Sequence, residues 1–154
     1  MLNLFRRKGI PERIPIRREE DYHTHNIGKT KDGQQFFGYQ TFVFPNEIAE
    51  DWQNQRKEYV VLYIFDRDGN YVKTDHWYAG TTAETTDSAT TAKLEQMIAA
   101  LGEVHYGDIK VKPFQTVIDG IVFGLVPDEE YQTVELQPSS TISFHAPWDG
   151  EYDT

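Results

Sequence analysis

Runs of hydrophobic residues separated by Asp-Gly pairs predict that this chain is built from β-hairpins. The pairs at residues 32–33, 68–69 and 119–120 each lie between two apolar or alternating runs. A tight hairpin turn needs a positive φ, which glycine adopts without steric cost. The fourth pair, at residues 149–150, lies in the C-terminal tail, where we expect no second strand for it to lead into.

The runs beside these turns give the expected strands. The run Tyr59–Phe65 is apolar at every position, which is typical of a central strand that is covered on both faces. The connections within each hairpin are short, so the pairing is expected to be antiparallel. The expected hairpin strands are residues 23–30 with 35–44, 59–65 with 71–79, and 115–118 with 121–126, and further strands are expected at 131–136 and 141–144.

One amphipathic helix is predicted after the second hairpin. Asp87 or Ser88 is the expected N-cap, and Gly102 suits a left-handed C-terminal cap. Because the apolar stripe covers a single face, the helix should lie on one side of the sheet. The stripe consists of residues spaced at i, i+3, i+4 and i+7, namely Leu94, Met97, Ile98 and Leu101.

These elements predict a single α+β domain with an antiparallel, hairpin-built sheet of about six to seven strands and one main helix packed on one face. A length of 154 residues suits one domain. We divide the chain into a basic N-terminal arm, residues 1–20, and the α+β domain, residues 21–154. Two prolines disfavour a helix in the arm, where Ile14 and Ile16 could form a short edge strand.

The net charge of −10 is unevenly distributed. Residues 1–18 carry six basic residues and one acidic residue, whereas the rest of the chain carries nine basic and twenty-four acidic residues. An acidic body repels phosphate backbones, which argues against general nucleic-acid binding. The basic segment is expected to be a solvated leader, with contact to an anionic surface as the alternative.

Composition also restricts the chemistry and the location of the protein. The chain has no cysteine, which excludes disulfides, thiolate metal sites and cysteine catalysis. No secretory signal is recognisable, because the charges at the N-terminus follow a very short apolar stretch. The longest apolar run, residues 59–65, is too short to span a bilayer. We therefore expect a cytoplasmic protein without a membrane span.

Motifs for catalysis or nucleotide binding fail at required positions. Residues 28–30 resemble the end of a phosphate-binding loop, but histidine occupies the position of its first glycine. Residues 66–70 resemble the start of a calcium loop, but tyrosine and tryptophan stand where glycine and glutamate are needed. Neither a Gly-x-Ser-x-Gly nor a Gly-x-Gly-x-x-Gly motif is present. We therefore favour a non-enzymatic protein without a cofactor.

Four side chains form the best candidate for a metal or small-molecule site. His23 and His25 are two positions apart on an expected strand, so their side chains should point to the same face. Asp75 and His76 lie on another expected strand. The histidines and the carboxylate could hold zinc or iron if the sheet brought them within about 5 Å of one another. A polar, half-exposed strand explains the same histidines without a metal.

Three tryptophans are the candidate contact residues for a protein partner. Trp52 lies in a polar connection, Trp77 follows His76, and Trp148 lies in the acidic tail. Tryptophan is enriched at protein interfaces, although Trp77 and Trp148 could instead close the ends of the sheet. The acidic body favours a basic partner, such as a transcription regulator. A basic toxin of nuclease type is the alternative partner, and this protein would then be an immunity-type inhibitor.

Six segments carry motifs of a known group of proteins. They are His25–Gly28 (HNIG), Asp32–Phe36 (DGQQF), Phe65–Asn70 (FDRDGN), His76–Thr82 (HWYAGTT), Gly107–Val111 (GDIKV) and Pro147–Thr154 (PWDGEYDT). In these segments the chain resembles bacterial proteins labelled formate hydrogenlyase regulatory proteins, from about residue 22 to the C-terminus. The resemblance implies a regulatory role, and no catalytic or ligand residues are carried over from the group. With a single predicted helix there is no helix-turn-helix, so regulation through protein–protein contact is favoured.

Overall fold

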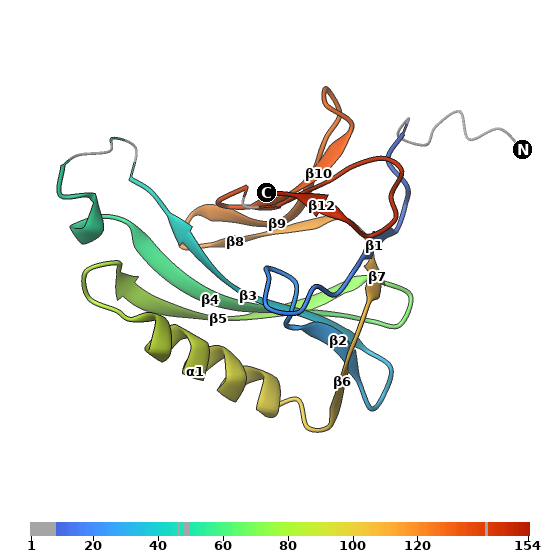
Figure 1. Cartoon of the computed structure of the whole chain (residues 1–154), viewed down its shortest axis with the longest axis horizontal. Coiled ribbons are helices and arrows are strands. Elements are labelled where there is room, and N and C mark those ends of the chain that lie inside the picture. Colours follow the sequence, from blue (N-terminus) through green and yellow to red (C-terminus); the bar gives the residue numbers. More distant parts are fainter. Residues whose placement is uncertain (1–8, 46, 48–49, 141) are drawn as a thin grey trace, which may run out of the picture.

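The computed structural model describes residues 9–45, 47, 50–140 and 142–154, and it shows two stacked antiparallel sheets and one α-helix (Figure 1). Its elements are β1 (Ile14–Ile16), β2 (Ile27–Thr30), β3 (Gln35–Val43), the short 3-10 helix η1 (Trp52–Asn54), β4 (Lys57–Phe65), β5 (Tyr71–Thr81), α1 (Asp87–Ala99), β6 (Val104–Tyr106), β7 (Ile109–Val111), β8 (Phe114–Ile118), β9 (Ile121–Asp128), β10 (Thr133–Gln137), β11 (Ser143–Phe144) and β12 (Tyr152–Asp153). One sheet has the strand order β5-β4-β3-β2-β6, and the second has the order β12-β11-β10-β9-β8. Strands β1 and β7 form a small third sheet.

Strand β4 is central because its two faces lie in two different cores. Its odd-numbered residues from Tyr59 to Phe65 pack toward the second sheet, and its even-numbered residues from Val60 to Ile64 pack toward α1. All seven of these side chains are at most 1% exposed. The expected strand covered on both faces is confirmed. Figure 1 shows α1 along one face of the first sheet and the second sheet on the other.

The helix lies on one face of the sheet, as expected. Leu94, Met97 and Ile98 are buried in the core that α1 shares with β3 and β4. The N-cap is Thr86, one residue before the expected position, because its Oγ1 accepts a hydrogen bond from the Ala89 N–H at 3.1 Å.

The α+β class and the antiparallel pairing are confirmed, but the expected single sheet of six to seven strands is wrong. The described residues form twelve strands in three sheets. Hydrophobic alternation shows that a strand has a buried face and does not show which element covers that face. In addition, five strands are only two or three residues long, which is too short for alternation to reveal them: β1, β6, β7, β11 and β12.

Three isoleucines of residues 10–16, a segment that we expected in a basic arm, are part of the core. Ile14 and Ile16 are fully buried and Ile10 is 2% exposed. The expected short strand at Ile14–Ile16 is present as β1, where it pairs with β7. This part of the expected arm therefore packs against the core through its isoleucines. Residues 1–8 lie outside the described residues.

The turn between β8 and β9 is the expected tight hairpin, and it also contacts the central strand β4. Asp119 and Gly120 have φ values of 52° and 78° and connect the paired ends of β8 and β9, as expected for a tight hairpin. The Tyr59 hydroxyl donates to Asp119 Oδ2 at 2.8 Å, which ties this turn to β4. Burial, and next the hydrogen bond to Asp119, raise the pKa of Tyr59.

The C-terminal Asp-Gly pair does lead into a strand, contrary to our expectation. Strand β12 pairs with β11, with Tyr152 opposite Phe144. The Gly150 carbonyl accepts a hydrogen bond from the Arg17 N–H at 2.9 Å, so the tail also holds the segment that follows β1. A two-residue strand was too short to recognise from the sequence.

No helix in the described part of the chain has the length and apolar character needed to cross a membrane.

Candidate functional site

Strand β3 is paired along its whole length on one side and along only part of its length on the other. Strand β4 pairs with all of Gln35–Val43, whereas β2 pairs with only the first three residues. Backbone groups alternate between the two edges of a strand. The Gly38 N–H points to the β2 side, because it donates to the Asn26 carbonyl at 2.9 Å. The backbone groups of Gln40 and Phe42 must point to the same side, where no described strand pairs with them.

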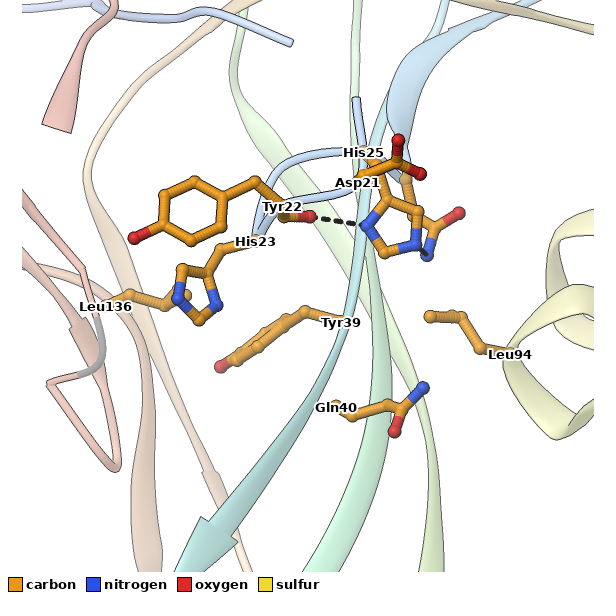
Figure 2. Close-up of a pocket in the computed structure, with 9 residues that line it drawn as sticks. Asp21, Tyr22, His23, His25, Tyr39, Gln40, Leu94 and Leu136 are labelled. Atoms are coloured by element: carbon orange, nitrogen blue, oxygen red, sulfur yellow. Dashed lines mark hydrogen bonds between the residues drawn. The ribbon is translucent and has the colours of Figure 1, made fainter. Parts of the chain in front are cut away.

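A hollow of about 280 Å³ lies beside this free edge, at the point where β2 ends (Figure 2). The chain from residue 21 to residue 26 forms turns, so it leaves the plane of the sheet instead of pairing with β3. Figure 2 shows Leu136 of β10 and Leu94 of α1 on opposite sides of β3. The hollow is lined by Asp21, Tyr22, His23, His25, Asn26, Tyr39, Gln40, Leu94 and Leu136.

The two histidines of the hollow have different surroundings. His25 is held within its own loop, where Asn26 Nδ2 donates to its Nε2 at 2.9 Å and its Nδ1 therefore donates to the Tyr22 carbonyl at 2.5 Å. The His23 ring packs against the Tyr22 ring, with 4.6 Å between the centroids, and lies near Leu136 and Tyr39 in Figure 2. Burial, and next the nearby His25, lower the pKa of His23.

The lowered pKa of His23 predicts that its protonation opposes folding. The folded-state pKa lies below the unfolded value of about 6.5, so this contribution to stability is complete above about pH 6.5 and is lost as the pH falls toward the folded-state pKa. We expect His23→Gln to reduce the loss of unfolding free energy between about pH 7.5 and pH 5.5, measured by urea denaturation. An unchanged pH dependence in this variant would contradict the prediction.

His145 provides a control of opposite sign. Its pKa is raised, first by the hydrogen bond between its Nδ1 and the Ala146 carbonyl and then by Asp153, whose Oδ2 lies 3.0 Å from its Nε2. A raised pKa gives stability that is present below the unfolded value and lost as the pH rises through the folded value. His145→Gln should therefore increase the loss of stability on acidification, whereas His23→Gln should decrease it.

The structure does not bring the four candidate metal ligands together. His23 and His25 lie in the turns before β2, and the strand that we expected to carry them begins only at residue 27. Asp75 and His76 lie on β5, which is separated from β2 by β4 and β3. Neighbouring strands are about 4.8 Å apart, so roughly 14 Å separates β2 from β5 across the sheet. The part of the chain that the structure describes contains no group of three or more side chains that could hold a metal ion.

Trp52 belongs to an aromatic group at the end of the free edge. The guanidinium carbon of Arg56 lies 4.4 Å from the ring centre of Phe42, 5.5 Å from that of Phe44 and 4.9 Å from that of Trp52. Arg56 Nη2 also lies 3.1 Å from Glu58 Oε1. Phe44 is 39% exposed, so this aromatic group remains accessible to a partner.

The other two tryptophans lie elsewhere and are half-buried. Trp77 packs against the core beneath α1, with Lys93 Nζ 5.7 Å from its ring centre. Trp148 packs against the opposite core, between the two sheets. The three tryptophans therefore do not form one continuous surface. Of the three, Trp52 alone lies in the chain that directly follows the free edge of β3.

Sequence reasoning missed the free edge and its hollow. We expected the first strand of the hairpin to begin at residue 23 and so to pair with most of β3. The signal that could have shown the difference is the stretch from His23 to Asn26, which is polar throughout and lacks the alternation of the residues that follow.

Comparisons with known proteins found no relative of this chain. No family model, no curated protein and no solved structure matches the chain.

Proposed function

We propose that this chain is a non-enzymatic interaction protein that binds an extended segment of a partner protein along the free edge of β3. The proposal rests on Tyr39–Val43, which is paired with β4 on one side and with no described strand on the other. A free edge presents unpaired N–H and C=O groups to an incoming strand. Peptides bind to several protein families by adding a strand in this way.

The hollow supports this mode of binding because it would give the added strand specificity. In strand addition, main-chain hydrogen bonds supply affinity and pockets for alternate side chains supply selectivity. The hollow lies directly beside Gln40, and its lining includes Leu94 and Leu136. An apolar side chain of the partner would fill it, and the uncharged form of His23 would pack against that side chain.

The charges near the other end of the edge favour a basic partner. Figure 1 shows η1 and the start of α1 at the same end of the molecule. Of the two cations nearby, Arg56 is already paired with Glu58, and Lys57, opposite Val43, is exposed. The exposed carboxylates of this end are Glu47, Glu50, Asp51, Glu84 and Asp87. Lysine or arginine residues beside the apolar anchor of the partner would complement them.

A regulatory role is part of the proposal. Contact through a strand edge needs no catalytic group and no cofactor, and it fits the resemblance to formate hydrogenlyase regulatory proteins. A partner such as a transcription regulator has the basic character that this edge would select. We place the interaction in the cytoplasm, a compartment with which a cysteine-free chain is compatible.

Amide hydrogen exchange tests whether the edge is free. We expect the Gln40 and Phe42 amides to exchange at least about a hundredfold faster than those of Tyr39 and Thr41, which point toward β4. The measurement is residue-resolved exchange by NMR on the full chain. Equal protection of the two pairs of amides would show that another part of the chain covers the edge.

A selection from a displayed library of random twelve-residue peptides tests the interaction itself. We expect enriched peptides that combine an apolar residue with flanking lysine or arginine, and their addition should slow the exchange of the Gln40 and Phe42 amides. Gln40→Pro removes the outward N–H and should abolish binding, while Gln40→Ala should retain it. Thermal unfolding of both variants checks that they fold. Peptides that protect other amides, or that bind Gln40→Pro normally, would contradict the proposal.

A further inference from the structure

Five basic side chains surround a second hollow, of about 580 Å³, which has no part in the proposed strand addition. They come from four separate segments of a chain whose net charge is −10. Asp108 is the only carboxylate among the described residues of the lining, and its Oδ1 accepts a hydrogen bond from the Arg18 N–H at 2.8 Å. The basic side chains are Arg13, Lys29, Lys31, Arg67 and Lys110, and we call the space between them the basic hollow.

The segments that form the basic hollow are fixed by a buried glutamine. Gln35 is 2% exposed and lines the hollow. Its Nε2 donates to the Asp66 carbonyl at 3.1 Å, and its Oε1 accepts from the Lys110 N–H at 2.7 Å. These bonds join β3 to the turn that carries Arg67 and to β7. The hollow is therefore held open by the fold itself rather than assembled from mobile surface loops.

Within the described part of the chain, the cations of the basic hollow are hydrogen-bonded to the main chain and not paired with carboxylates. Arg67 Nη2 donates to the Asp32 carbonyl at 2.6 Å, and Arg13 Nη2 donates to the Lys110 carbonyl at 3.4 Å. Both acceptors are main-chain oxygens. Among the described residues, none of the five cations forms an ion pair with a carboxylate. Arg13 Nε is also buried without a hydrogen-bond partner.

Five unpaired cations around one hollow repel one another, and a bound anion of several charges would remove that repulsion. We propose that the basic hollow binds a small molecule through a chain of phosphate groups. Arginine offers a planar fork that matches phosphate oxygens, and lysine adds point charges, so the mixture suits a di- or triphosphate. The volume lies within the usual range for small-molecule sites.

The lining indicates which part of such a ligand is recognised. Among the described residues, no aromatic ring lines the basic hollow, so a nucleobase would find no surface there to stack on. The phosphate chain itself, whether free or carried by a nucleotide, is therefore the recognised group. A long nucleic acid is disfavoured, because the body outside residues 1–18 carries twenty-four acidic and only nine basic residues. Strand β7, which carries Lys110, lies at the end of the molecule opposite the start of α1 (Figure 1), and the basic hollow shares no lining residue with the hollow beside β3.

Calorimetric titration of the full chain with inorganic triphosphate tests this proposal. We expect one triphosphate per chain, and binding about tenfold weaker or more in Lys110→Glu. Lys57→Glu is the matched control, because Lys57 is exposed, lies outside the basic hollow and changes the net charge by the same amount. Thermal unfolding without ligand shows whether each variant folds, and Lys29→Glu replaces Lys110→Glu if the latter does not.

The other arms of the experiment separate the sources of phosphate. ATP should bind about as tightly as triphosphate, and orthophosphate should bind at least about tenfold more weakly. Equal weakening by Lys110→Glu and Lys57→Glu would reduce the effect to general charge and overturn the proposal. The absence of triphosphate binding would overturn it as well. A single-stranded RNA oligonucleotide that binds in a Lys110-dependent manner, where triphosphate does not, would identify a macromolecular ligand instead.

Discussion

Replacing Gly124 by alanine is expected to lower the free energy of unfolding by about 4 kcal/mol, which is a large part of the stability of a domain this size. Gly124 lies on β9 with φ +142°, in a region that L side chains rarely adopt. A Cβ atom at this position would also lie 2.3 Å from the Phe114 carbonyl oxygen and 3.0 Å from the Gln115 Cα. Both atoms belong to the backbone of β8, so neither can move aside without breaking the strand pairing.

Gly107→Ala is the matched control for this prediction. Gly107 has an ordinary φ, and no atom lies within 4 Å of the position of its added Cβ. We expect its unfolding free energy to change by no more than about 0.5 kcal/mol. Urea denaturation of both variants measures the difference. If the two variants lost the same stability, the close approach of β8 and β9 at Gly124 would be disproved.

Ile14→Ala is expected to cost about 3 kcal/mol of stability. Ile14 is fully buried and pairs with Val111 of β7, so truncation would leave a cavity in the core between the sheets. The control is Val117→Ala, because Val117 is 66% exposed and its truncation should change stability by no more than about 0.5 kcal/mol. Thermal and urea unfolding of the two variants provide the measurement.

The same variant tests the position of the N-terminal segment in the fold. If residues 10–16 were a solvated arm, Ile14→Ala would unfold at the same urea concentration as the unmodified chain. A loss of the expected size would show that β1 contributes to the cooperative unit in solution. It would also show that the basic residues on either side of β1 are held in place by the core, and Arg13 of the basic hollow is one of them.

The hydrophobic pattern was sufficient to predict those strands and helices whose signal lies within their own residues. The run Tyr59–Phe65 indicated a strand covered on both faces, and the spacing of Leu94, Met97 and Ile98 indicated a helix with one buried face. One signal is an uninterrupted apolar run and the other is a helical period, and each lies within a single segment, so both are visible without a partner. Short strands such as β12 carry no such period, and their pairing comes from contacts with residues far away in the chain.

The candidate sites depended even more than the short strands on contacts between residues that are far apart in the chain. The sequence placed His23 and Asp75 in one hypothetical site, but His23 lies in the turns before β2, and β3 and β4 lie between β2 and the strand of Asp75. It gave no sign that Arg13 and Lys110 share a hollow, because they are far apart in the chain and are brought together by the pairing of β1 with β7. Charge counts sum over the whole chain and cannot report where like charges meet.

By itself, the sequence determined the α+β class, the hairpins at residues 32–33, 68–69 and 119–120, and the single helix, because turn chemistry and hydrophobic period act over a few residues. Only the tertiary structure decided that two sheets stack, that Tyr39–Val43 keeps a free edge, and that five cations surround one hollow. These features depend on which segments end early and which distant segments meet. That choice is made by the packing of the whole core and not by any one segment.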